Sequence, residues 1–498
     1  MNITFVYRGF ESLGIESLSA VLKQAGYGVD LVYDPALFDT MFVTQKAISQ
    51  FVSYYPVTLQ RLKEKKSEIF AFSVFSDDYS WASRMAKDLK QVKPESIIVF
   101  GGIHPSTLPE KVVQEEFIDY VCVGEGEGPF LDLIKAIDHK EDVKKIPNIW
   151  SKRGGEVFSN HPRQLVEDLD ALPFPDKDLF HEEYYGFSTH YYNIVSTRGC
   201  PFDCTFCYPS YFRELYKNKG KFLRRRSVDN VIEELIKAKE KYNMKMVNIL
   251  DDVFTFDKEW LRDFARKYHK YVNIPNFCFI HPMCVDKEIV GSLKTMNTVA
   301  VNMGIQVADE GLRKQLLNRQ ESNEAIKKTM RLISETNIFL YVDLLLGVPG
   351  QDKGELINTA NLLSEHRPDA VTMCWLNYYP KTKISEIVKN SNWAKQKSQD
   401  LDEETQKLGF LILISNLLPK RILRLMIDKR LYKLLPQLSP KSYRTYTVNF
   451  AFACFISFWK EVFRLKKTTA LYALRKVLSY YIFFTKKILN LNRVSHDK

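Results

Sequence analysis

Short apolar runs alternate with amphipathic stretches along the first part of the chain. The apolar runs lie at residues 2–7, 29–33, 69–75, 97–102 and 118–127. Helical spacing or a long loop follows each run, with helices expected around residues 15–25 and 81–90. Strands that are apolar on both faces and separated by helices are typical of a parallel sheet covered on both sides. The pattern therefore predicts an N-terminal, doubly wound (Rossmann-like) α/β domain.

Ligands of such a domain bind beyond the carboxyl ends of its strands. The loops expected at those ends are residues 8–14, 73–79, 101–107 and 124–129. Glycines at 101, 102, 124, 126 and 128 would allow a large, flat ligand to approach the backbone closely.

A second series of alternating strands and helices follows a connector at residues 139–190. The connector contains a hairpin that turns at Gly154 and Gly155, and a proline-punctuated extended stretch. The new strands are expected at residues 192–197, 246–252, 277–282, 299–307, 340–349 and 370–380, with helices between them such as 228–241 and 323–336. Six such units predict a partial (β/α)6, TIM-like barrel whose chemistry lies at the carboxyl ends of its strands.

Beyond about residue 390 the pattern becomes helical only, at residues 407–435, 446–467 and 470–491. The apolar runs there are about 11 to 14 residues long, shorter than the roughly 20 that span a bilayer. Residues 407–498 carry 19 Lys and Arg against 3 Asp and Glu, a charge of +16, so the remaining 52 and 57 leave residues 1–406 at −5. The basic character belongs to this tail, and no nucleic-acid partner is expected.

Two interpretations of the tail remain open. Clustered Lys and Arg among Phe, Leu, Ile, Trp and Tyr are typical of a helix at an anionic membrane surface. The alternative is a helical cap that packs on the barrel and exposes a basic face. The composition is otherwise globular, with 45% apolar and 26% charged residues. The first residues lack a secretory pattern and eight cysteines form no disulfide framework, so we expect a cytoplasmic protein.

Three of the eight cysteines stand together in "STRGCPFDCTFCYPSYF", residues 196–212. Cys200, Cys204 and Cys207 follow directly after the first barrel strand, at the expected mouth of the active site. A structural zinc site would need a fourth ligand, for which His190, Cys278 and Cys284 are the candidates. An iron–sulfur cubane held by three cysteines instead leaves one iron open for another ligand.

The spacing in "CPFDCTFC" resembles that of the radical S-adenosylmethionine (SAM) superfamily. Further motifs in the same order strengthen the resemblance: "NILDDVFTFD", "MGIQVADEGLRKQLLNR" and "DLLLGVPGQ". The segments "GGIHPSTLPEKV" and "DYVCVGEGEGPF" are similar to signatures of the cobalamin-binding module that is fused to one branch of this superfamily. The likeness covers about residues 1–390.

This resemblance implies a domain organisation. Residues 1–138 would form a cobalamin-binding domain, 139–190 a connector, 191–390 the radical SAM core barrel and 391–498 a basic, all-α C-terminal region. The implied cofactors are a [4Fe–4S] cluster, SAM and cobalamin.

Site residues follow from the matching motifs. The cluster ligands would be Cys200, Cys204 and Cys207, with SAM on the fourth iron. The implied SAM contacts are Asp251, Asp252, Gln306, Arg319, Gly347, Val348 and Pro349. The implied cobalamin contacts are Ser76, Gly101, Gly102, His104, Gly124, Glu125 and Gly126.

Some positions depart from the family pattern. Val307 stands where many relatives have a serine, and Lys381 replaces the glycine of a Pro-Gly-Thr motif. The chain lacks the DxHxxG signature that supplies a histidine to cobalt. The lower face of cobalt is therefore left to His104 or to a cover of Phe75, Tyr79 or Trp81.

The resemblance implies reductive cleavage of SAM to a 5′-deoxyadenosyl radical, with an electron from a reductant such as flavodoxin or ferredoxin. The first hypothesis is methylation of an unactivated carbon of a small substrate, which would be hydrophobic if the tail binds membrane. An oxidative cyclase or a rearranging enzyme without net methylation is the alternative. A cobalamin- and cluster-binding sensor without turnover is a third hypothesis from another class.

Overall fold

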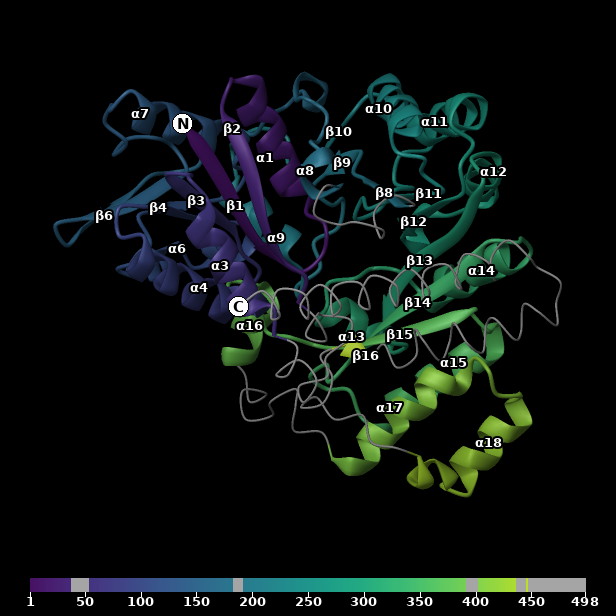
Figure 1. Ribbon diagram of the computed structural model, residues 1–498. Helices are drawn as coiled ribbons and strands as arrows, with labels where there is room; N and C mark the ends of the chain where they lie inside the picture. Colours follow the sequence, from purple (N-terminus) through teal and green to yellow (C-terminus); the bar gives the residue numbers. More distant parts are fainter. Residues whose placement is uncertain (37–52, 182–190, 391–401, 436–444, 447–498) are drawn as a thin grey trace, which may run out of the picture.

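The computed structural model describes residues 1–36, 53–181, 191–390, 402–435 and 445–446. The described residues form two largely parallel sheets, each covered by helices, and the sheets lie next to each other (Figure 1). This arrangement confirms the predicted α/β fold class with an N-terminal doubly wound domain and a partial barrel.

The first sheet has the strand order β2-β1-β3-β4-β5-β6-β7. Its parallel strands are β1 (Asn2–Arg8), β2 (Gly28–Asp34), β3 (Ile69–Ser73), β4 (Ile97–Gly101) and β5 (Tyr120–Cys122). Its helices are α1 (Leu13–Gln24), α3 (Tyr55–Glu64), α4 (Tyr79–Val92), α5 (Ile103–Thr107), α6 (Pro109–Val112) and α7 (Glu127–Asp138). Neighbouring residues on β1 point to opposite faces: Phe5 packs with Ile15 and Phe130, and Val6 with Phe72 and Met85. Both faces are therefore buried, as the apolar runs predict.

The glycine hairpin extends this first sheet. Strands β6 (Ile149–Arg153) and β7 (Glu156–Ser159) turn at Gly154 and Gly155, and β6 pairs antiparallel with β5. The sequence placed the hairpin in the connector because its turn is visible but its pairing partner is not. Strand β5 has three residues and an edge that is open until β6 satisfies its backbone groups.

The second sheet has the order β16-β15-β14-β13-β12-β11-β8. Its parallel strands are β8 (Tyr191–Ile194), β11 (Met246–Ile249), β12 (Asn276–Ile280), β13 (Thr298–Gln306), β14 (Phe339–Leu346) and β15 (Ala370–Trp375). The helices around it are α10 (Val228–Lys241), α11 (Lys258–Tyr271), α12 (Lys287–Thr295), α13 (Glu310–Gln315), α14 (Asn323–Ser334), α15 (Lys353–His366) and α16 (Lys383–Lys389). Strands β8 and β15 do not pair with each other, so the barrel is incomplete, as predicted.

Side chains alternate along the second half of β13. On β13, Val301, Met303 and Ile305 are completely buried in the main core of the barrel. Asn302 and Gln306 on the same strand point the other way and stay half-buried. The inner face of the barrel is thus partly open and carries polar groups.

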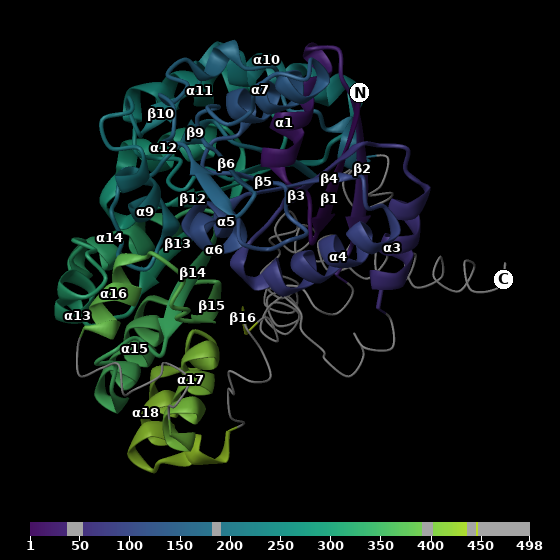
Figure 2. The same ribbon diagram turned by 90° about the vertical axis from the view of Figure 1, so that its left-hand side faces the viewer.

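The C-terminal region begins as predicted, with α17 (Glu403–Ser415) and α18 (Lys420–Asp428). Helix α17 packs on α15, and both views place it and α18 at the end of the barrel away from the first sheet (Figures 1 and 2). Strand β16 (Thr445–Tyr446) pairs antiparallel with β15, so this region is not entirely helical. A strand forms there because β15 has an open edge.

The helices predicted at 446–467 and 470–491 lie outside the described residues, apart from Tyr446 in β16. Within the described ranges, the helices are all too short or too polar to cross a membrane.

Candidate functional site

The three clustered cysteines lie on an arm between β8 and α10. The arm leaves the barrel through β9 (Thr197–Arg198) and returns through β10 (Arg224–Arg225), which pairs with it antiparallel. Helix α9 (Tyr208–Leu215) starts at Cys207, which is its N-cap residue. The arm therefore holds the cysteines at the carboxyl end of β8, where the sequence places them.

The thiols of the arm influence one another. Burial raises the pKa of Cys200 to about 12 and raises the pKa of Cys204 and Cys207. The neighbouring thiols and Asp252 raise the pKa of Cys207 further, whereas Arg319 opposes the rise at Cys204. No three His, Cys, Asp or Glu side chains of the described ranges are arranged around a single-ion site. The assignment of Cys200, Cys204 and Cys207 as cluster ligands remains a prediction.

Backbone and side-chain contacts fasten the arm to the barrel. Arg213 of α9 donates to the carbonyl oxygen of Cys200 at 2.6 Å, which closes the cysteine loop on itself. The backbone N–H of Thr205 donates to Leu317 at 3.1 Å, and its hydroxyl donates to the carbonyl oxygen of Leu316 at 2.7 Å. The cysteine loop is thus tied at Thr205 to the segment that follows α13.

Asp251, a predicted SAM contact, is buried and already engaged. Its carboxylate accepts hydrogen bonds from the backbone N–H groups of Ser196 and Thr197, at 2.6 and 3.1 Å, and from both of their hydroxyls. The guanidinium of Arg225 lies 3.7 Å from it. Asp251 therefore anchors the chain at the point where it enters the cysteine arm.

Asp252 lies on the side of the cysteines. Its side chain is exposed, and its pKa is raised by surrounding protein atoms and by the carboxylate of Asp251. Asp252 in turn raises the pKa of Cys200 and Cys207, so its carboxylate lies near these thiols. Of the two adjacent aspartates, it is the one whose position suits a ligand of the cluster region.

The predicted pair Gln306 and Arg319 lies together at the end of β13. The Arg319 guanidinium donates to the carbonyl oxygen of Gly304 at 2.7 Å and to the Cys204 sulfur at 3.9 Å. The amide nitrogen of Gln306 lies 2.4 Å from where a Cβ of residue 304 would stand, so any larger residue there would displace the end of the Gln306 side chain. Gln306 itself adopts a positive φ of 65°.

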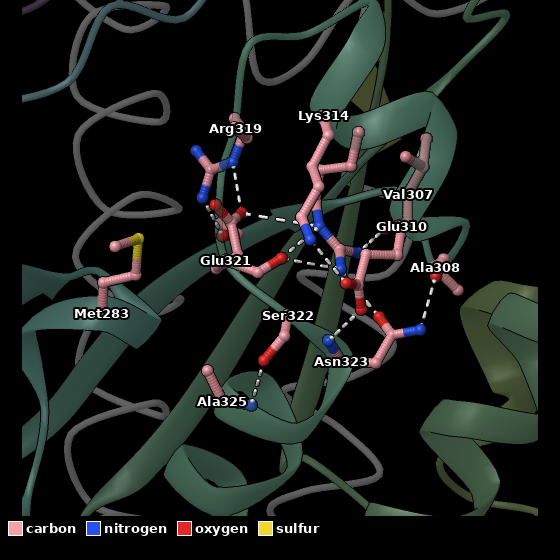
Figure 3. A network of polar contacts seen from close by, with 12 residues as sticks. Met283, Val307, Ala308, Glu310, Lys314, Arg319, Glu321, Ser322, Asn323 and Ala325 are labelled. Atoms are coloured by element: carbon pink, nitrogen blue, oxygen red, sulfur yellow. Dashed lines mark hydrogen bonds and ion pairs between the residues drawn. The ribbon is translucent and has the colours of Figure 1, made fainter.

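Arg319 is held by a carboxylate that the sequence reasoning missed. Glu321 is buried and accepts from Arg319 at 2.6 Å, and Figure 3 shows the two side chains facing each other. His281, at the end of β12, lies 3.6 Å from Glu321 and stacks on Phe202 of the cysteine loop at 3.7 Å. Burial and Arg319 lower the pKa of His281 to about 2, so the imidazole is neutral. This network packs against the cysteine loop through the stacking of His281 on Phe202.

The predicted contacts at Gly347, Val348 and Pro349 form the turn after β14. The side-chain oxygen of Gln351 accepts from the backbone N–H groups of Gly347 and Val348, at 2.9 and 3.4 Å. Val348 is almost completely buried. The turn is therefore rigid, and a ligand could meet only its backbone.

The inner face of the barrel contains polar atoms without partners. Oδ1 of Asp343 and Oδ1 of Asn302 are buried and accept no hydrogen bond from any described residue. Burial raises the pKa of Asp343 to about 6, although hydrogen bonds from Asn302 and Thr372 lower it. The sequence does carry a signal here, because Asp343 interrupts the apolar run "LYVDLLLGVP" at an inward position.

A cavity of about 460 Å³ lies between the first sheet and the arm. Part of its wall is apolar and comes from the sheet and helix α7, with Phe5, Ala71, Val99 and Phe130. Its outer end is lined by residues from both parts of the chain: Gly101, Gly102, Gly124, Glu125, Gly126, Arg198 and Gly199. The structure thus brings five of the predicted cobalamin contacts to one cavity, beside the cysteine arm.

The other two predicted cobalamin contacts, Ser76 and His104, do not line this cavity. They hydrogen-bond each other at 3.0 Å, and the imidazole of His104 stacks on Tyr79 at 4.1 Å. Burial and Lys111 lower the pKa of His104. Phe75 has 44% of its surface exposed and Trp81 donates to Asp34, so among the described aromatic residues Tyr79 is the one packed on His104.

The two departures from the family pattern have simple structural explanations. Val307 is completely buried in a small apolar cluster with Leu317 and Val348, where a hydroxyl would find no water. Lys381 adopts a left-handed φ of 61°, so the conformation that favours glycine is kept without the glycine. Its ammonium lies 3.3 Å from Glu110 of the first domain.

The residues present fit the three implied cofactors. Three thiols on one short arm that raise one another's pKa suit an iron–sulfur cluster with an open iron. The orphaned acceptors of Asp343 and Asn302 call for donors, which the hydroxyl groups of a nucleoside supply. The cavity suits a flat base, because glycines and apolar side chains such as Phe5 and Phe130 form much of its wall.

Comparison with known proteins leads to the family. A family model described as "Radical SAM superfamily" matches residues 194–363, and one described as "B12 binding domain" matches residues 5–134. The chain belongs to the B12-binding radical SAM family. Its cofactors are therefore a [4Fe–4S] cluster, SAM and cobalamin.

Relatives within this family have several activities. An uncharacterised methyltransferase of Pyrococcus horikoshii is 27% identical over 64% of this chain and 70% of the relative. An anaerobic magnesium-protoporphyrin IX monomethyl ester cyclase of Cereibacter sphaeroides is 24% identical over 76% of this chain and 62% of the relative. The radical SAM methyltransferase TsrM of Kitasatospora setae, with cobalamin and a [4Fe–4S] cluster bound, has the same fold, with a TM-score of 0.61 at 17% identity over 78% of each chain.

Proposed function

We propose that this radical SAM enzyme methylates an unactivated carbon of a small substrate. The cluster with SAM supplies the means to remove a hydrogen atom, and cobalamin supplies a transferable methyl group. The residues of the chain position both reagents and exclude water between them.

One observation carries the proposal. The cavity beside the glycine loops of the first sheet is also lined by Arg198 and Gly199, the residues that precede Cys200. This arrangement supports a cobalamin site next to the predicted cluster site. Methyl transfer to a carbon activated at the cluster requires this proximity, because both reagents must reach the same atom.

Anaerobic reconstitution with iron, sulfide and cobalamin tests the proposal. With SAM and a strong reductant, we expect both 5′-deoxyadenosine and S-adenosylhomocysteine, measured by mass spectrometry. A Cys204→Ala variant is expected to release no 5′-deoxyadenosine. Cobalamin-loaded wild-type protein that makes 5′-deoxyadenosine without S-adenosylhomocysteine would contradict methyl transfer.

The cyclase among the relatives defines a second candidate function, oxidative ring formation without methylation. Product mass separates the two, since methylation adds one methylene unit to the substrate and cyclisation adds none. If the protein keeps its cluster intact but releases neither 5′-deoxyadenosine nor S-adenosylhomocysteine, a non-catalytic sensor would be favoured instead.

We propose that flavodoxin or ferredoxin delivers the electron that SAM cleavage consumes. Such electron carriers are acidic and would be repelled by residues 1–406, which have a net charge of −5, whereas residues 407–498 have a net charge of +16. An acidic reductant would thus be attracted from the tail side. The rate of 5′-deoxyadenosine release with flavodoxin should fall steeply as salt rises.

We further propose peripheral contact of the tail with an anionic membrane, which would favour a hydrophobic substrate. The supporting observation is a set of exposed apolar side chains on α18 and the turn after it. Ile422, Leu425 and Leu434 are exposed there, the last with 84% of its surface, next to Arg421 and Arg424.

Liposome sedimentation tests this contact. Leu425→Glu in the full chain should reduce pelleting with phosphatidylserine vesicles. Ile387→Glu is the matched control, because Ile387 is exposed on α16 and remote in sequence from this surface. Equal pelleting of wild type and Leu425→Glu would contradict the membrane proposal.

A further inference from the structure

Helix α9 starts at a cluster cysteine and ends at the first domain. Cys207 is its N-cap residue, and the helix has eight residues. A helix this short is not stable by itself and depends on its tertiary contacts. What holds the two ends of α9 therefore links the cysteine loop to whatever the other end touches.

Two tyrosines on α9 contact two of the ligand loops of the first sheet. The hydroxyl of Tyr208 hydrogen-bonds with Ser76 at 2.9 Å, in the loop after β3. The hydroxyl of Tyr211 donates to the carbonyl oxygen of Ser106 at 2.8 Å, in the segment after β4. The Ser106 hydroxyl in turn accepts from the N–H of Gly124 at 2.8 Å, so the segment is tied to the loop after β5.

A third tyrosine, Tyr216 at the C-cap of α9, contacts that loop directly. Its hydroxyl accepts from the N–H of Glu125 at 2.7 Å and from the side chain of Asn148 at 3.3 Å. A Cβ at position 124 would lie 2.0 Å from this hydroxyl, and Gly124 has a positive φ of 81°. The first glycine of the GEGE motif is therefore fitted to Tyr216 of the arm. Each tyrosine reaches a different loop at the carboxyl edge of the sheet.

The base of the arm makes ionic contacts with the same motif. Arg198 and Arg224 are register partners in the β9–β10 ribbon, so their side chains leave the arm together. Arg224 donates to both carboxylate oxygens of Glu125, and Arg198 pairs with Glu127 and lies 3.6 Å from Glu125. Ser17 of α1 donates to Glu127 at 2.9 Å. Glu127 and Arg224 are buried, so these pairs are fixed rather than solvated.

We propose that α9 and the two arginine–glutamate pairs couple the cofactor sites, so that assembly of the cluster and binding of cobalamin strengthen each other. In this role Glu125 is a positioning residue for the arm, not only a wall of the cavity. When Cys207 binds the cluster, the first turn of α9 is held in place with it. The tyrosines of α9 then hold the three loops of the first sheet in place. The inference rests on the two cofactors of the proposed function and not on methyl transfer.

Coupling of this kind is reciprocal and can be measured without turnover. We expect the dissociation constant of hydroxocobalamin, followed by its visible absorbance, to be about 5-fold or more lower for cluster-loaded than for iron-free protein. Conversely, bound cobalamin should slow the loss of iron to a chelator. Equal dissociation constants with and without the cluster would overturn the proposal.

Phenylalanine variants then locate the coupling. Removal of one hydroxyl, as in Tyr216→Phe, should bring the ratio of the two dissociation constants about 2-fold or more closer to one, since one hydrogen bond is worth at most about 10-fold. The triple variant at 208, 211 and 216 should abolish the coupling. The ratio compares two forms of one protein, so a general loss of affinity cancels, and thermal unfolding checks that each variant folds.

Tyr271→Phe is the matched control, because Tyr271 lies at the end of α11 with 46% of its surface exposed. Its ratio should equal that of wild type. A triple variant that keeps the wild-type ratio would overturn the role of α9. The result also stands apart from the proposed function, since a coupled protein that forms no S-adenosylhomocysteine would contradict methylation alone.

Discussion

Asp251 and Asp252 are neighbours in the chain with opposite surroundings. The Asp251 carboxylate accepts four hydrogen bonds from the residues that start the cysteine arm. The Asp252 carboxylate lies near the cysteines and accepts none of these hydrogen bonds. Asp251→Ala is expected to cost about 3–5 kcal/mol, because it removes the carboxylate beside the buried guanidinium of Arg225 and leaves two N–H groups without an acceptor. Asp252→Ala should cost less than about 0.5 kcal/mol.

The two variants should diverge in binding as well. Asp252→Ala is expected to load a normal cluster but to bind SAM about tenfold more weakly, the equivalent of one charge-assisted hydrogen bond. Asp251→Ala should lose iron because the arm is no longer anchored. Urea denaturation, iron content and SAM binding measured on both proteins check this, and equal stability of the two variants would contradict it.

Asp343 makes the stability of the protein depend on pH. Burial raises its folded-state pKa to about 6, above the roughly 3.9 of an unfolded chain. Between these values the folded protein binds a proton that the unfolded chain has released, so the free energy of unfolding falls as pH rises through this window. Asp343→Asn cannot titrate, and we expect it to be about 1–2 kcal/mol more stable than wild type at pH 7.5 and equal below pH 4.

Urea denaturation of both proteins between pH 4 and 7.5 measures this difference. A constant difference across the range would contradict the assignment. The same variant should bind SAM more weakly if the carboxylate accepts from a nucleoside hydroxyl. A buried carboxylate that costs stability is typical of a ligand site.

Motif positions could be predicted at the residue scale, and their partners could not. The sequence points to Cys204, Gln306 and Arg319, but Glu321 and His281 become visible only when β12 and β13 lie side by side. Tyr216 likewise follows no motif. Its significance depends on Gly124, which is 92 positions earlier in the chain and belongs to the other sheet.

At the scale of elements, strands with continuous apolar runs were predictable because burial on both faces leaves a clear pattern. The parallel strands of both sheets, and helix α10 to the residue, follow from it. Strands β6, β7 and β16 did not receive their correct places, since they occupy edges that the sequence does not display. The domain boundaries at 138, 190 and 390 stay predictions, and the pairing of β6 with β5 argues for moving the first one to about residue 159.

Helices α17 and α18 show that one region can combine a core element with a surface element. Leu411 of α17 is completely buried in the barrel core, whereas half of Leu425 on α18 is exposed. Leu411→Ala should therefore destabilise the protein by about 2–5 kcal/mol, and Leu425→Ala by less than about 0.5 kcal/mol. Thermal unfolding compares them. Similar losses would mean that both helices pack against the barrel.

At the scale of the whole molecule, a buried ionic cluster joins the connector to both sheets. The Lys177 ammonium lies 2.6 Å from Glu11 and 2.7 Å from Glu16, and all three side chains are at least nine-tenths buried. Glu11 also accepts from Asn193 of β8, which hydrogen-bonds Asn248 of β11 at 2.8 Å. The Lys177 ammonium is thus one of the contacts that hold the two cofactor domains in position.

Lys177→Met tests that dependence. Without the ammonium, two carboxylates are left in a dry site, and we expect a loss of about 3–5 kcal/mol at pH 8. Burial and Glu11 already raise the pKa of Glu16, and Lys177 opposes this, so the variant raises it further. A group with a raised folded-state pKa loses stability as pH rises, so the variant should recover part of its loss at pH 5.5. Lys237→Met, which removes an exposed pair with Glu233, should cost about 0.5 kcal/mol or less. Thermal unfolding at both pH values measures these losses of stability. If Lys177→Met loses the same stability at pH 8 and at pH 5.5, water reaches the two carboxylates, and the connector does not bury them between the two domains.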